Sequence, residues 1–100
     1  MKALFFIKEN KDKVECLIKQ DDLINRQSII IRSADSLDIN DKFKNGYFLL
    51  IDGNDEAIKK ADKLLKDLSE RVVNKNEEKI ISKIKEEEEK AIEGFGGILG

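Results

Sequence analysis

Apolar residues in the first half of the chain gather in short runs that predict β-strands. Val14, Cys16 and Ile18 recur at every second position, which is the period of a half-exposed strand. Two later runs are continuously apolar and rich in β-branched or aromatic residues, and turn residues such as Asn45-Gly46 bound the second of them. The pattern therefore predicts four strands, over residues 3–7, 14–18, 28–32 and 47–51. The first two would form a hairpin across a polar loop.

The second half of the chain has the period of α-helices. From Asn54, a residue suited to an N-cap, apolar residues recur on one helical face as far as Val72. This pattern predicts a helix over residues 54–73, and a second helix follows over 77–93.

Acidic residues interrupt the apolar stripe of the second helix. It begins with Ile80, Ile81 and Ile84, but Glu87 and Glu88 occupy the next positions on that face. Burying an unpaired carboxylate would cost several kcal/mol. We therefore expect the first two turns of this helix to pack on the domain and the remainder to leave it.

Residues 94–100 follow as a glycine-rich apolar tail, Gly-Phe-Gly-Gly-Ile-Leu-Gly. Gly94 is placed to end the helix in a left-handed conformation, so the domain is expected to span residues 1–93. The apolar residues around this helix end are the predicted partner-binding residues: Ala91, Ile92, Phe95, Ile98 and Leu99. They could dock on another chain or fold back on their own domain.

These elements predict the α+β class, with a four-stranded, mainly antiparallel sheet over residues 2–52 and two C-terminal helices packed on one face. A β-α-β-β-α-β order is disfavoured, because no long amphipathic helix separates the first two predicted strands. Both faces of the sheet are apolar, so two helices on one face would leave the other uncovered. That face would present about five large residues: Leu4, Phe6, Ile30, Phe48 and Leu50. A partner, a second copy, curvature of the sheet into a half-barrel or the chain's own tail must cover it, and we favour a second copy.

The composition of the chain limits the classes of function that we expect for it. Of 100 residues, 40% are charged, and 19 basic against 21 acidic residues give a net charge of −2, which disfavours nucleic-acid binding. The single cysteine fits a reducing cytoplasm, and no apolar run approaches membrane-spanning length. Enrichment in Lys and Glu resembles proteins of thermophilic archaea.

Candidate chemistry is sparse. With no histidine in the chain, the Ser-His-Asp and Cys-His arrangements and a His-ligated metal are impossible within one chain. Cys16 is expected to be a small buried hydrophobe. Asp35, Asp38 and Asp41 recur every third residue but break the EF-hand pattern, so we predict no metal or cofactor. The acidic turn before residue 57 is expected to cap a helix and not to bind phosphate.

The sequence thus favours a non-enzymatic protein–protein interaction or assembly module that self-associates. The alternative is a small regulatory domain that binds a metabolite between sheet and helices or at a dimer interface. An enzyme would have to rely on carboxylates, lysine or Tyr47, or on a site shared with another subunit.

Overall fold

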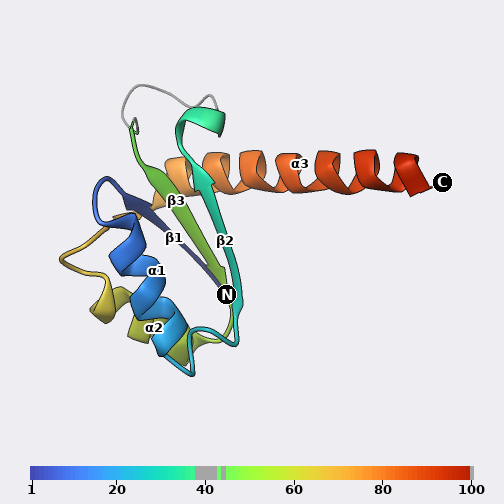
Figure 1. Ribbon diagram of the computed structural model, residues 1–100. Helices are drawn as coiled ribbons and strands as arrows, with labels where there is room; N and C mark the ends of the chain where they lie inside the picture. Colours follow the sequence, from blue (N-terminus) through green and yellow to red (C-terminus); the bar gives the residue numbers. More distant parts are fainter. Residues whose placement is uncertain (38–42, 44, 100) are drawn as a thin grey trace.

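The chain folds into one four-stranded antiparallel sheet with helices on both faces (Figure 1). The computed structural model describes residues 1–37, 43 and 45–99, and in residues 36 and 90–99 it describes the backbone. The strands are β1 (Lys2–Ile7), β2 (Ser28–Ser33), β3 (Tyr47–Asp52) and β4 (Glu70–Val72). The helices are α1 (Lys11–Gln20), α2 (Asp55–Leu64) and α3 (Asn74–Leu99), with a short 3₁₀ turn, η1, at Asp35–Leu37. The α+β class and the four-stranded antiparallel sheet are confirmed.

The strands lie in the order β2-β3-β1-β4. With α1 between β1 and β2 and α2 between β3 and β4, this is the β-α-β-β-α-β order of ferredoxin-like folds, to which α3 is added. The prediction that disfavoured this order was wrong. The sheet also draws on residues up to Val72 and not on residues 2–52 alone.

The predicted strand over residues 14–18 is helix α1. Val14 and Ile18 are both buried and lie four residues apart, whereas Cys16 between them is exposed. A Lys11–Glu15 ion pair of 3.3 Å spans one turn of the helix. So short a run fits both the alternation of a strand and the spacing of a helix. It forms a helix because Val14 and Ile18 then pack together against the core. Cys16 is therefore not the buried residue that we expected.

The predicted helix over residues 54–73 divides into α2 and β4. Asn54 does cap α2, because its side chain accepts a hydrogen bond of 2.9 Å from the amide of Ala57. After Leu65, however, the Ser69 hydroxyl donates to the Leu65 carbonyl at 2.9 Å, and the chain turns back to pair with β1. Long-range strand pairing here overrides a helical pattern in the sequence.

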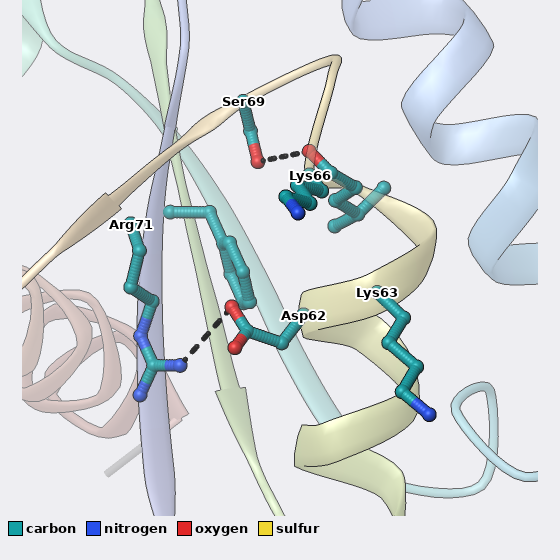
Figure 2. A pocket seen from close by; sticks show the side chains of 7 residues that line it. Asp62, Lys63, Lys66, Ser69 and Arg71 are labelled. Atoms are coloured by element: carbon teal, nitrogen blue, oxygen red, sulfur yellow. Dashed lines mark hydrogen bonds and ion pairs between the residues drawn. The ribbon is translucent and has the colours of Figure 1, made fainter.

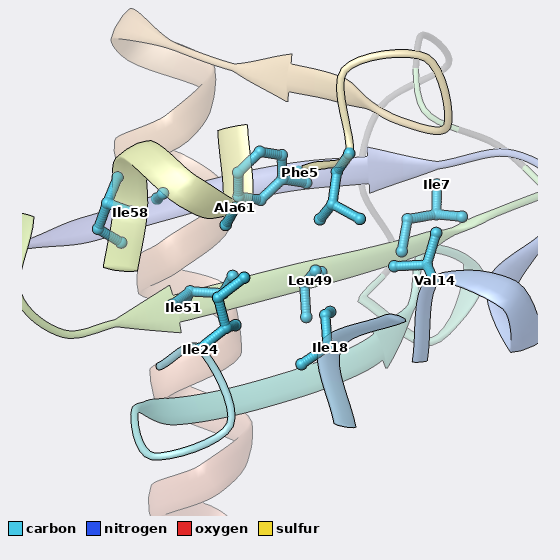
Figure 3. Close-up of a cluster of buried hydrophobic side chains, with 11 residues drawn as sticks. Phe5, Ile7, Val14, Ile18, Ile24, Leu49, Ile51, Ile58 and Ala61 are labelled. Carbon is cyan, nitrogen blue, oxygen red and sulfur yellow. The ribbon is translucent and has the colours of Figure 1, made fainter. Parts of the chain in front are cut away.

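The core on the first face of the sheet lies under α1 and α2 (Figure 3). Alternate residues of β1 and β3 point to this side of the sheet. Residues of α1, of α2 and of the turn between α1 and β2 pack against them. The cluster consists of Ala3, Phe5, Ile7, Val14, Ile18, Ile24, Leu49, Ile51, Ile58, Ala61 and Leu65.

The second face of the sheet is covered by α3 and by residues that follow β2. The intervening strand residues, including the Phe6 and Phe48 that we expected to be uncovered, form a second buried cluster there. Its other members are Leu4, Leu50, Val72, Ala34, Leu37, Phe43, Ile80 and Ile84, with Ile30 and Ile81 packed against it. The two C-terminal helices thus lie on opposite faces, and the prediction that this face awaits a second copy was wrong, because the chain's own α3 covers it.

Candidate interaction surface

Helix α3 is held on the sheet by its first turns. Ile80 and Ile84 are 1% and 0% exposed, and Ile81 is half-buried beside them. These are the apolar residues that open the stripe predicted from the sequence. They anchor α3 over the central strands, from which it runs on towards β2 (Figure 1).

Where α3 reaches the outer strand β2, two of its glutamates pair with an arginine of that strand. The Arg32 guanidinium on β2 donates to Glu88 and lies 3.8 Å from the Glu87 carboxylate. Each of these three side chains is about one-third exposed, so neither carboxylate is buried unpaired. The expectation that the stripe breaks at Glu87 and Glu88, where the helix leaves the core, is confirmed.

The remainder of α3, residues 89–99, we call the α3 extension. Figure 1 shows it projecting past β2, away from the strands of the sheet. At 1.5 Å per residue it adds about 16 Å of helix. The helix continues through Gly94 to Leu99, so the prediction that Gly94 ends it was wrong.

All five predicted partner-binding residues fall in the α3 extension. Ala91, Phe95 and Ile98 occupy helix positions that continue the side of α3 defined by Ile80 and Ile84, and Ile92 and Leu99 occupy the adjacent positions. Their side chains lie outside the described part of the structure. The helix brings the five positions onto adjoining sides of one short segment, beyond the edge of the sheet.

The two outer strands of the sheet differ strongly. β4 has three residues, and its Arg71 lies 3.4 Å from Asp62. β2 has six residues, and Ile29, Ile30 and Ile31 at its centre are all half-buried. Short, charged edges resist pairing with another chain, whereas long apolar ones favour it.

The hydrogen-bond pattern shows which backbone groups face outward at the edge of β2. The Ala34 amide donates to the Gly46 carbonyl at 2.8 Å, next to the Ser33–Tyr47 pair in the register of β2 and β3. In an antiparallel ladder, hydrogen-bonded residue pairs alternate with pairs that are not hydrogen-bonded. The backbone groups of Ile30 and Arg32 therefore face β3, and those of Ile29 and Ile31 face outward. The Arg32 side chain donates to the Ile31 carbonyl at 3.3 Å.

A cavity of about 430 Å³ lies at the opposite edge, between α2 and β4 (Figure 2). Lys63, Lys66 and Arg71 give it positive charge, and Asp62 partly neutralises them. The Arg71 guanidinium lies over the Phe5 ring at 5.4 Å, and its Nε has no hydrogen-bond partner among the described residues. The sequence analysis missed this cluster, because it joins the end of α2 to a strand that was predicted as helix.

Among the described residues, Asp21 and Lys85 are ionisable groups away from this cavity whose pKa values are shifted. A hydrogen bond from Lys60 at 2.8 Å, together with the amides of Ile24 and Leu23, lowers the pKa of Asp21 and ties α1 to α2. Contact with Lys2 lowers the pKa of Lys85 on α3.

The described residues contain no cluster of acidic or cysteine side chains that could hold a metal ion. Asp38 and Asp41 lie outside them, and Asp35 lies in η1. Within the described part of the chain, no helix has the length and apolar character needed to cross a membrane.

Comparison with known proteins found no match to this chain among protein-family models, curated proteins or solved structures. The function of the chain is therefore inferred from its own site.

Proposed function

We propose that this protein is a non-enzymatic interaction module that self-associates, with the α3 extension as its docking segment. The observation that carries the proposal is the division of α3 at Glu87 and Glu88. Before these residues the helix is buried on its own sheet, and after them it projects past β2 (Figure 1). None of the four described strands then lies beneath the apolar positions of the extension.

The sequence of the α3 extension supports docking on protein. Five of its positions are large or apolar residues, Ala91, Ile92, Phe95, Ile98 and Leu99, and an amphipathic helix that inserts anchors at such spacings is a common recognition mode. The near-neutral charge of the chain argues against nucleic acid as the partner. The single cysteine and the Lys- and Glu-rich composition support a reducing cytoplasm and a thermophilic source.

The proposal is tested by Phe95→Ser, with Glu93→Ser as its matched control. Position 95 lies on the same side of α3 as Ile84, and position 93 lies on the opposite side. We expect light scattering after size exclusion to show a weakened oligomer for Phe95→Ser and an unchanged one for Glu93→Ser. A native chain that is monomeric at all concentrations would refute the proposal.

A second candidate function is binding of a small anionic metabolite, favoured by the cavity between α2 and β4. Its Lys63, Lys66 and Arg71 outnumber the single carboxylate of Asp62. Phosphate, citrate and nucleotides are suitable probes, because each would recruit these cations. A rise in melting temperature with any of them that disappears in Lys66→Ala would favour this function, whereas no rise would remove it.

A further inference from the structure

The outer strand β2 is the part of the sheet best suited to pair with another strand. It is six residues long, and its Ile29 and Ile31 amides face outward, where the described part of the chain supplies no partner strand. Its one charged residue, Arg32, is already matched by Glu87 and Glu88, so pairing there would not desolvate an isolated charge. The opposite edge, β4, is only three residues long, and two of these, Glu70 and Arg71, are charged.

From this arrangement we infer that two copies of the chain join antiparallel through β2, forming one continuous eight-stranded sheet. The inference rests on the proposed self-association and specifies its geometry. A two-fold axis perpendicular to the sheet is the symmetry that places β2 antiparallel to its own copy. With the axis near Ile30, the outward groups of Ile29 would pair with those of the partner's Ile31.

The length of α3 identifies the occupant of this edge as a second copy. The two-fold axis keeps the corresponding face of both sheets on one side, so each α3 extension would pass over the partner's β2. An extension of about 16 Å covers roughly three strand spacings of 4.8 Å. The two extensions would run antiparallel, side by side, across the junction of the sheets.

The side of α3 that would face the junction carries apolar positions, as docking on a second copy requires. Ile80 and Ile84 face their own sheet, and positions 91, 95 and 98 continue that side of the helix. The helix would therefore direct apolar positions first towards its own sheet and then towards the copy. On the other face, an apolar groove of about 280 Å³ beside Ile18, Ile29 and Ile31 runs along the same edge.

Amide hydrogen exchange of the full-length protein at low and high concentration tests the inference. We expect the Ile29 and Ile31 amides to exchange about tenfold more slowly, or slower still, in the concentrated sample, because each gains a cross-strand acceptor. The Arg71 amide is the matched control. It faces outward at the edge of β4, since Leu4 and Phe6 use their backbone groups for the neighbouring Val72 and Glu70. Its exchange should not change.

A pair of lysine variants gives a second measurement. Ile31→Lys would place like charges at the centre of the junction and should weaken dimerisation about tenfold or more. Val73→Lys adds the same charge beside β4 at a residue that is 49% exposed, and it should leave the dimer unchanged. Circular dichroism establishes that each variant is folded.

The outcomes separate this inference from the proposed function. Concentration-dependent protection of Ile29 and Ile31, with Arg71 unaffected, supports pairing through β2. A dimer in which these amides exchange equally fast at both concentrations overturns the pairing and leaves self-association standing. A chain that is monomeric throughout overturns both.

Discussion

Replacing Ile84 by alanine should substantially weaken the packing of α3 on the sheet. Ile84 is 0% exposed and lies between α3 and the second face of the sheet. Burial of an isoleucine side chain contributes about 1.5–3 kcal/mol, and the cavity left by truncation raises the total cost to about 2–5 kcal/mol. For a domain of this size, whose total stability is roughly 5–15 kcal/mol, the loss is large.

Urea denaturation and thermal melting measure this effect. A loss of about 3 kcal/mol should lower the melting temperature by roughly 10 °C or more. Ile81→Ala is the matched control, because Ile81 is the same residue type on the same helix but only half-buried, and its truncation should cost about 1 kcal/mol. Equal losses for the two variants would show that α3 does not pack on the sheet through Ile84, and the reasoning would then fail.

Three further changes test other parts of the structure. Arg32→Gln should destabilise the protein by about 0.5–1 kcal/mol at low salt and by less at high salt, measured by urea denaturation. Asp21→Asn should lower stability at neutral pH, because the lowered pKa of Asp21 beside Lys60 stabilises the fold above the unfolded-state pKa. This stabilisation is lost as the pH falls through the folded-state pKa, so wild-type and variant melting curves should converge in acid and diverge towards neutral pH. Gly46→Ala should cost about 1–3 kcal/mol, because its Cβ would lie 2.6 Å from a backbone oxygen of β1. Gly53→Ala, which meets the flexible side chain of a glutamine, should cost less in the same melting experiment.

The sequence was a reliable guide where an apolar run was long and bounded by turn residues. The strands predicted over residues 28–32 and 47–51 match β2 and β3 to within one residue. Asn54 caps α2 as predicted, because a side-chain oxygen before an exposed helix start has an amide to accept from in most surroundings. Such features depend on local chemistry, which is readable without knowing the fold.

Prediction failed where the outcome depended on distant residues. Val14 and Ile18 fit a strand and a helix equally well, and only packing against the first core decided between them. The strand β4 exists because Glu70 and Val72 pair with β1, more than sixty positions earlier in the chain. Once these two segments were misassigned, the β-α-β-β-α-β order could not be recovered, and the cavity beside Arg71 was missed with it.

The glutamates of α3 show how one sequence feature can mark the boundary of a domain. Carboxylates interrupt the apolar stripe where the helix crosses the outermost strand, and Arg32 on that strand pairs with them. The ion pairs with Arg32 therefore account for Glu87 and Glu88 at this crossing. The apolar positions that resume at Ala91 are different, because they lie beyond all four strands that the structure describes (Figure 1). The stripe as far as Ile84 packs on the sheet of its own chain, and the apolar positions beyond Glu88 are the ones for which we propose docking on a second copy.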